Sequence, residues 1–307
     1  MGFAILAGCG EAPEADEIGQ NEASLSGEGG ESAPNARDGQ FPSTLHLTSL
    51  EVACTATKIG PRHILTAGHC ALDESKKIDG PFKPGGNLFV SNKAKLVPAG
   101  CTKSEPACFV SKEQTAIGLG YVKVTVEKTL LEPVFAKKPL TLGEGSDLAV
   151  ILLTAESAAK IKNIPTAKID FSAVHPGDAL TLQGYGEDCL QFNQRPELRY
   201  ADAKAIPALR ATTPDPESPP PPPPISEALR KKIEKVMFFT DSNLRLGPTL
   251  CSGDSGAPVF RKGKPNIVVG VNSTGWHDSQ MYSNWHVRLD DKTDAKVHAW
   301  LKSTLAQ

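Results

Sequence analysis

Short apolar runs, each followed by turn residues, recur along the chain from about residue 41 to residue 200. Runs of this kind predict strands, and their regular succession predicts two antiparallel β-barrels with a cleft between them. Residues 63–66 form one such run, which leads into a turn of small residues. Residues 148–153 are continuously apolar, a pattern typical of a strand that is buried on both faces.

Two other segments have the spacing of amphipathic helices. In the segment 226–236, Ser226 can cap the start, and the apolar residues that share one face are Leu229, Ile233 and Val236. In the segment 294–305, the apolar residues that share one face are Val297, Trp300, Leu301 and Leu305. We therefore expect one helix in the second half of the chain and another at its C-terminal end.

Two segments lack any such pattern. Residues 10–40 are rich in Glu, Gly, Ser and Ala with hardly any large apolar side chain, which predicts a flexible acidic tether. Residues 212–224 contain six consecutive prolines and are expected to be extended and stiff. The simpler interpretation of this proline run is a spacer, and the alternative is a ligand for an aromatic-lined groove on a partner.

Charge and hydropathy exclude some classes of partner. The 307 residues carry a formal net charge of −2, with acidic and basic residues well mixed. No basic face indicates nucleic-acid binding, and no polybasic stretch indicates binding to anionic lipid. No apolar run reaches the roughly 18 residues that a membrane-spanning helix needs. Partners must therefore be sought among other classes of molecule, and the chain is expected to be a monomer.

Three short motifs carry candidate chemistry: LTAGHC at 65–70, GSDLAVILL at 145–153 and CSGDSGAPVF at 251–260. They supply His69, Asp147 and Ser255. A serine hydroxyl becomes a useful nucleophile when an imidazole takes its proton and a carboxylate orients that imidazole. Gly253 and Gly256 permit a tight turn, so the N–H groups of Gly253 and Ser255 are expected to form an oxyanion hole.

Other histidines and aspartates lack this context. His63, Asp170 and Asp178 are interpreted as surface or loop residues rather than members of the site.

The three motifs, in this order, resemble those of the chymotrypsin/trypsin family of serine endopeptidases, whose members carry TAAHC, DIALL and GDSGGP. The resemblance extends from about residue 41 to the end, since TLQGYG at 181–186 and VVGVNSTG at 268–275 are also similar to family segments. It implies an all-β fold of two six-stranded antiparallel β-barrels, with the active site between them and a C-terminal helix. It implies protein or peptide substrates, with membrane contact only through a lipid anchor, and it implies no cofactor and no metal.

Together with the composition, these observations predict a division of the chain into segments. These are a truncated signal or lipobox segment at 1–9, the tether at 10–40, and a trypsin-like domain at 41–307 with insertions at about 73–120 and 210–225.

The resemblance assigns further roles around the cleft. Ser273, Thr274 and Gly275 would bind the substrate backbone as an added strand. Thr249 would lie at the base of the primary specificity pocket, so specificity for Lys or Arg is not expected. Beyond Trp276, either Tyr282 or His286 takes the position of a family tyrosine near this pocket, and a histidine facing it would favour an acidic substrate side chain.

The seven cysteines suggest an exported protein. Cys9 lies in LAGC, which resembles a bacterial lipobox, and is predicted to be lipidated; the alternative is an unpaired cysteine in a signal remnant. The resemblance implies a disulfide between Cys54 and Cys70. Six cysteines allow fifteen connectivities, and the pairs favoured for the other four are Cys101–Cys108 and Cys189–Cys251. The domain is thus placed outside the cytoplasm, anchored by lipid or secreted.

One departure from the family concerns activation. Family members free an Ile-Val-Gly-Gly terminus whose ammonium pairs with the aspartate before the nucleophile, here Asp254, and the chain has no such segment. A buried carboxylate needs a partner, so Asp254 is expected to have an internal cationic or hydrogen-bonded one. The sequence thus predicts a serine endopeptidase acting through an acyl-enzyme. The alternative is a non-catalytic or zymogen-locked, tethered binding protein with a protease fold.

Overall fold

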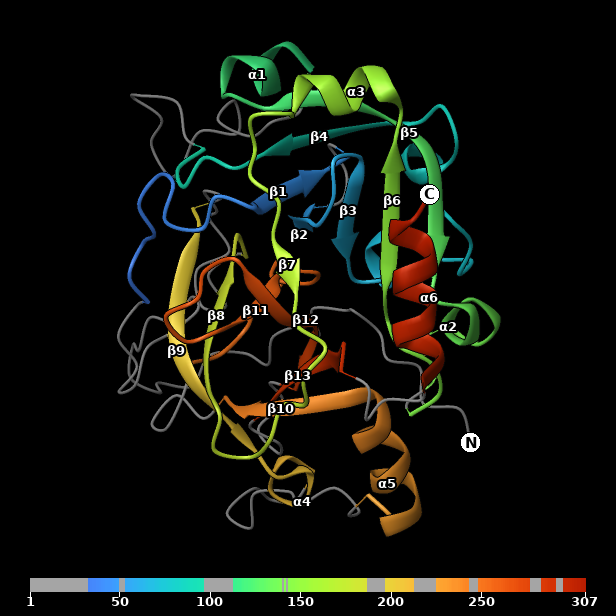
Figure 1. Ribbon diagram of the computed structural model, residues 1–307, viewed down its shortest axis with the longest axis vertical. Helices are drawn as coiled ribbons and strands as arrows, with labels where there is room; N and C mark the ends of the chain where they lie inside the picture. Colours follow the sequence, from blue (N-terminus) through green and yellow to red (C-terminus); the bar gives the residue numbers. More distant parts are fainter. Residues whose placement is uncertain are drawn as a thin grey trace, which may run out of the picture.

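The computed structural model describes residues 33–49, 53–96, 113–139, 141, 143–186, 197–212, 225–242, 248–276, 283–290 and 295–307. The chain forms two β-barrels, the first built from its first half and the second from its second half (Figure 1). In the described part of the chain, no helix is long and apolar enough to cross a membrane.

The first barrel closes in the strand order β1-β2-β3-β6-β5-β4, with every neighbouring pair antiparallel. Its strands are β1 (Thr44–Thr48), β2 (Ala53–Lys58), β3 (His63–Thr66), β4 (Asn87–Ser91), β5 (Val122–Leu131) and β6 (Ala149–Leu153). The strand predicted at 63–66 is confirmed as β3. Strand β6 is buried on both faces, as predicted, because Ile151 points into the barrel interior and Val150 packs in the cluster that continues into the second barrel.

The second barrel also has six strands, in the order β11-β8-β9-β10-β13-β12, and a pairing between β11 and β12 closes it. Its strands are β8 (Ala179–Gly184), β9 (Arg199–Ile206), β10 (Met237–Asp241), β11 (Pro258–Arg261), β12 (Ile267–Trp276) and β13 (Ser283–Arg288). A short strand, β7 (Lys168–Ile169), joins β12 in parallel. The expected fold class, two six-stranded antiparallel barrels, is confirmed.

Helices lie around the barrels (Figure 1). They are α1 (Glu113–Gly118), α2 (Pro133–Lys137), α3 (Ala155–Lys160), α4 (Ala208–Ala211), α5 (Glu227–Val236) and α6 (Ala295–Leu305), with 3-10 turns η1 (His69–Ala71) and η2 (Gly80–Phe82). Both helices predicted from spacing are confirmed as α5 and α6. The Ser226 hydroxyl caps α5 by accepting a hydrogen bond from Leu229 N at 3.2 Å.

Two predicted boundaries need correction. The acidic tether was expected to continue to residue 40, but Ala33 and Ala36 are already buried and Asn35 bridges to Arg199 of the second barrel. Small side chains such as alanine can pack against a sheet even where the sequence has no apolar run, so the composition of this segment did not predict its burial. The insertion expected at about 73–120 contains β4, which pairs with β1 and β5 as an integral strand of the first barrel. The signal segment and residues 213–224 of the proline-rich insertion lie outside the described residues.

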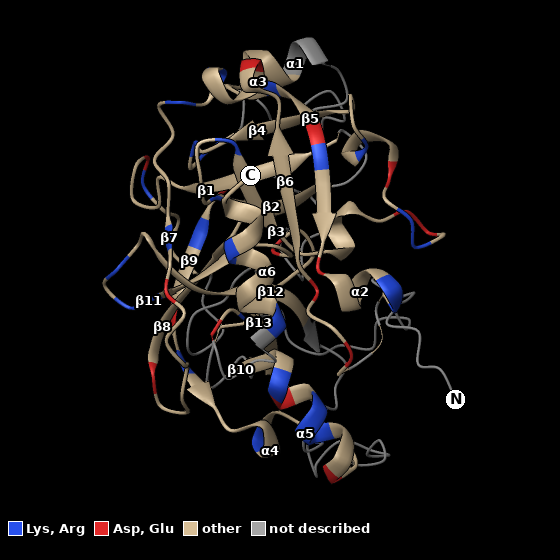
Figure 2. Cartoon of the chain, turned by 45° about the vertical axis from the view of Figure 1, so that its right-hand side comes forward, with Lys and Arg blue, Asp and Glu red and all other residues tan. Residues whose placement is uncertain are grey.

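Both basic and acidic positions occur on the described parts of the two barrels and on the helices around them, and several basic positions lie together on α5 (Figure 2).

Candidate active site

His69 and Asp147 meet where two paired strands of the first barrel end. His69 follows β3 and Asp147 precedes β6, and the antiparallel register that aligns Thr66 with Ala149 brings the two residues together. His69 Nδ1 lies 2.7 Å from Asp147 Oδ2, and His69 N donates to Asp147 Oδ1 at 2.8 Å. The carboxylate therefore holds both the ring and the main chain of the histidine.

The protonation states of this pair are coupled. Burial alone would lower the pKa of His69, but the charge and hydrogen bond of Asp147 outweigh it and raise that pKa above its ordinary value. Burial alone would raise the pKa of Asp147, but His69 and a hydrogen bond from Ser273 lower it overall. The arrangement favours an ionised aspartate beside an imidazole whose Nδ1 bears a proton.

Ser255 lies in the turn between residue 251 and β11, in the second barrel. Ser255 O accepts a hydrogen bond from Thr55 N at 2.8 Å, and Gly256 N donates to Asn272 O at 2.7 Å. Gly256 has a φ of +82°, and a side chain there would collide with Thr66 Oγ1. The sequence Asp-Ser-Gly therefore allows the nucleophile turn to lie directly against the first barrel.

Ser273 contacts two members of the candidate triad, Asp147 and Ser255. Its hydroxyl donates to Asp147 Oδ2 at 2.7 Å, and its carbonyl accepts from Ser255 Oγ at 3.5 Å. The register between β12 and β13 shifts at this point, leaving Ser273 as an extra residue between Asn272 and Thr274. This bulge explains why one residue can present both groups to the site. The sequence assigned Ser273 only to substrate binding and missed its contact with Asp147.

Gly253, the other predicted oxyanion donor, has a φ of +90°, a conformation that favours glycine. Its carbonyl accepts a hydrogen bond from Thr55 Oγ1 at 2.9 Å.

Asp254 is buried in a cradle of glycines from the second barrel. Its carboxylate accepts from Gly186 N at 2.7 Å and from Cys251 N at 2.9 Å. A side chain at Gly184 would place its Cβ 1.9 Å from Asp254 Oδ1, so the close approach requires glycine. Burial raises the pKa of Asp254 to about 6, against the two backbone hydrogen bonds and the charge of Arg199, which lower it. The expected hydrogen-bonded partner is thus confirmed as the backbone.

The residues assigned to the specificity pocket are only partly described. Thr249 is buried, and its hydroxyl donates to Ser242 O at 2.5 Å. Its role at the base of the pocket stays a prediction, as do the roles of Thr274 and Gly275 in β12. Tyr282 lies outside the described residues.

His286 does not face an open pocket. Its ring is fully buried inside the second barrel, with Nδ1 2.8 Å from Asn272 Oδ1 and Nε2 2.9 Å from Thr240 Oγ1. Burial lowers its pKa to about 3, so the ring is neutral at physiological pH. The alternative in which His286 faces the specificity pocket and binds an acidic substrate side chain is therefore wrong.

Asn284, which the sequence did not single out, holds residues 248–250, the segment that leads to the nucleophile turn. Its Oδ1 accepts from Leu250 N at 3.0 Å and its Nδ2 donates to Pro248 O at 2.6 Å. A polar residue inside an apolar strand is a weak signal in a sequence, because its partners come from a distant segment.

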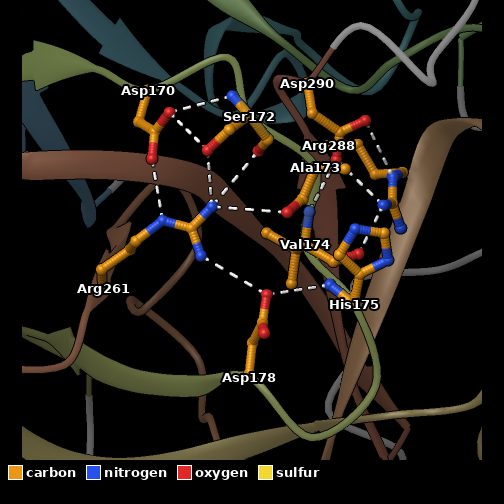
Figure 3. A network of polar contacts seen from close by, with 9 residues as sticks. All are labelled: Asp170, Ser172, Ala173, Val174, His175, Asp178, Arg261, Arg288 and Asp290. Atoms are coloured by element: carbon orange, nitrogen blue, oxygen red, sulfur yellow. Dashed lines mark hydrogen bonds and ion pairs between the residues drawn. The ribbon is translucent and has the colours of Figure 1, made fainter.

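Asp170 and Asp178, which the sequence analysis set apart from the site, belong to a network of ion pairs and hydrogen bonds on the second barrel (Figure 3). Arg261 Nε lies 2.8 Å from Asp170 Oδ2, and Arg261 Nη1 lies 3.4 Å from Asp178 Oδ2. Arg261 Nη2 also donates to Ser172 Oγ at 2.8 Å. These contacts fasten the loop before β8 to β11. His63, interpreted as a surface or loop residue, is instead buried in β3, where it lies close to the Thr304 backbone in α6.

The cysteines are accounted for in part. The predicted disulfide Cys54–Cys70 is present, with a Cα–Cα distance of 6.3 Å, and it joins β2 to the turn that carries His69. Cys251 is also disulfide-bonded. The partner predicted for it, Cys189, is one of the cysteines outside the described range, and the others are Cys9, Cys101 and Cys108.

Two six-stranded barrels with a serine, a histidine and an aspartate gathered at their junction define the chymotrypsin-like class of serine proteases. The family model described as Trypsin matches residues 99–290, which is more than half of the chain. The chain belongs to the trypsin family. A comparison with curated proteins gave no match. The matched region includes Asp147 and Ser255 but not His69, whose assignment depends on its contacts.

Proposed function

We propose that this protein is a serine endopeptidase that cleaves peptide bonds through an acyl-enzyme on Ser255. The observation that carries the proposal is the set of hydrogen bonds to Asp147, two from His69 and one from Ser273. Because its Nδ1–H donates a hydrogen bond to the Asp147 carboxylate and keeps its proton, His69 has the Nε2 lone pair free to accept the proton of the serine hydroxyl. His69 then returns that proton to the leaving amine.

The tetrahedral intermediate needs donors for its oxyanion. We assign this role to the N–H groups of Gly253 and Ser255, as the motif predicts. Such donors are aligned before the reaction and stabilise the charge that develops on the carbonyl oxygen. The substrate backbone would lie along Ser273–Gly275 as an added strand.

Two finer features of the proposal concern substrate and place. Thr249 offers no carboxylate at the base of the pocket, so cleavage after Lys or Arg is not favoured. The disulfide between Cys54 and Cys70 supports an oxidising, extracytoplasmic compartment. We propose that the protein is secreted or held at the envelope by lipid on Cys9, a residue outside the described range.

Labelling with a fluorophosphonate probe tests the chemistry, because the probe reacts with a serine that has a working base and oxyanion hole. We expect an adduct on Ser255, mapped by peptide mass spectrometry, in the full chain. Ser255→Ala should abolish the adduct, and proteolysis should fall to the roughly thousand- to ten-thousandfold acceleration over water that the oxyanion hole and binding supply.

The same experiment distinguishes an active endopeptidase from a binding protein or a locked zymogen. Folded protein that binds peptides but forms no adduct and cleaves nothing would overturn the proposal in favour of a binding protein or locked zymogen. A library of peptides with different residues before the scissile bond tests specificity, and preferred cleavage after Lys or Arg would contradict the assignment made from Thr249.

A further inference from the structure

Thr55, in the middle of β2, contacts the nucleophile turn through two of its own groups. Its N–H donates to Ser255 O at 2.8 Å, and its hydroxyl donates to Gly253 O at 2.9 Å. Thr55 is completely buried, and these bonds cross from the first barrel to the second. One threonine therefore holds the carbonyls on both sides of Asp254.

The direction of the Thr55 hydroxyl is fixed by a third group. Tyr185 N donates to Thr55 Oγ1 at 3.0 Å, and a backbone amide can only donate. The hydroxyl must then accept from Tyr185 and direct its own proton to Gly253 O. A threonine side chain in a strand has few χ1 choices, so little freedom is lost when these bonds form.

Thr55 is itself anchored beside the catalytic histidine. Thr55 O accepts from Thr66 Oγ1 at 2.9 Å, and Thr66 ends the strand that leads to His69. The neighbouring Cys54 is joined by its disulfide to Cys70, which follows His69. The point that holds the nucleophile turn is thus connected to the element that carries the base.

The turn needs external support because its glycine is conformationally free. Gly253, at a φ of +90°, has no side chain to resist a change in backbone angles. Asp254 is held by Gly186 N, from the turn that also supplies Tyr185 N to Thr55. Three consecutive residues, 253 to 255, are therefore fastened by groups outside the turn.

We propose that Thr55 is a positioning residue that keeps the turn at 253–255 in the shape the oxyanion hole requires. The inference depends on the proposed function, since it assigns Thr55 a role in that same site. It acts through the carbonyls of Gly253 and Ser255 and does not touch the substrate.

The test compares two substitutions at the same position. Thr55→Val keeps the shape and removes the hydroxyl, whereas Thr55→Ser keeps the hydroxyl. With a peptide ester substrate, we expect Thr55→Val to lower kcat by about tenfold to a hundredfold with KM changed less than about threefold, and Thr55→Ser to retain most of kcat. Affinity for a peptide boronic acid, which presents a tetrahedral oxyanion, should fall with kcat.

Thr57→Val is the matched control. Thr57 lies two positions along the same strand and is equally buried, and its hydroxyl has no hydrogen-bond partner among the described residues. Removing that hydroxyl should leave kcat unchanged. Thermal unfolding of each variant checks that it is folded, and Thr55→Ala replaces Thr55→Val if the latter does not fold.

The outcomes are distinguishable. Active wild type with unchanged kcat in Thr55→Val, or equal losses in Thr55→Val, Thr55→Ser and Thr57→Val, overturns the role of Thr55 and leaves the proposed function standing. Wild type that neither reacts with the probe nor cleaves peptides overturns both.

Discussion

Asp254 is an ionisable residue whose burial changes how stability depends on pH. Its pKa rises from 3.8 in the unfolded chain to about 6 in the fold, so the folded protein binds more protons than the unfolded one between these values. The free energy of unfolding contributed by Asp254 is therefore fully present below the lower pKa and is lost as pH rises through the window, by at most about 1.4 kcal/mol per pH unit.

We expect Asp254→Asn to remove this slope. Denaturant unfolding of variant and wild type at intervals from pH 4 to pH 7 measures it, and the difference between the two proteins cancels the contributions of other groups. The relative stability of the wild type should decrease across about one to two pH units as pH rises. An unchanged difference across the window would contradict a raised pKa.

His69 predicts the pH dependence of the rate. A base must be unprotonated to accept the serine proton, and Asp147 raises the pKa of His69 above 6.5. Activity should be lost as pH falls through that raised pKa, so the acid limb of kcat/KM should lie above about 6.5. An NMR titration of His69 in Ser255→Ala should give the same pKa, and a limb below the ordinary value would contradict the charge pairing.

The candidate triad was predictable residue by residue because each member lies in a motif with its own backbone requirement. Thr55, Ser273 and Asn284 were not predictable in the same way. Threonine, serine and asparagine in strands are ordinary residues, and their importance comes from partners 34 to 198 positions away or from a bulge that one sequence does not show.

At the scale of elements, helix α2 and its cap contact the residues that precede His69 and Asp147. Glu132 caps α2 by accepting from Phe135 N at 2.8 Å, and the same oxygen accepts from Ser146 N, next to Asp147. Phe135 is buried with its ring against Gly68, which stands where the family motif has alanine. The ring fills the place of the missing methyl group.

Gly68→Ala should therefore be harmful in this protein. The added Cβ would lie 2.5 Å from Phe135 Cε1 and 3.0 Å from Asp147 Oδ1, so the ring or the carboxylate must move. We expect a loss of about 1–3 kcal/mol in the free energy of unfolding, with a lower kcat, measured by denaturant unfolding and steady-state kinetics. Gly118→Ala, where no atom lies within 4 Å of the added group, is the control and should change neither.

The sequence predicted individual elements well where their pattern was long. Helices α5 and α6 and the buried strand β6 followed from apolar spacing, and Ser226 marked the start of α5. Strand β4 was hidden in a region interpreted as an insertion, because a strand at 87–91 flanked by loops differs little from a loop with apolar residues. The position of β4 in the first barrel is set by its pairing with β1 and β5, and such pairing between distant segments does not show in the local sequence.

At the scale of the whole molecule, the two barrels share one apolar cluster. It joins Leu65 and Val150 of the first barrel to Phe260 and Trp285 of the second, and Leu301 of α6 belongs to the same cluster. The fold class could be predicted because the order of the motifs fixes which barrel supplies each residue. The packing of Ala33 and of α6 against the barrels could not, since neither segment carries a motif.

Leu301→Ala tests this shared packing. Leu301 is fully buried, so we expect a loss of about 2–5 kcal/mol in the free energy of unfolding. Hydrogen exchange measured by mass spectrometry should show faster exchange in β3 as well as in β13, because the cluster joins both barrels. Lys302→Ala, a neighbouring exposed position, is the control, and faster exchange confined to α6 would contradict the shared core.

Two segments far apart in the sequence each pack on the barrel built from the other half of the chain. Ala33 packs in the core of the second barrel, whereas α6 lies beside β6 of the first (Figure 1), and the Thr304 backbone in α6 lies close to His63. The first barrel therefore acquires its final covering only when α6 packs against it, so the site between the barrels is complete only after residues 295–305 have folded.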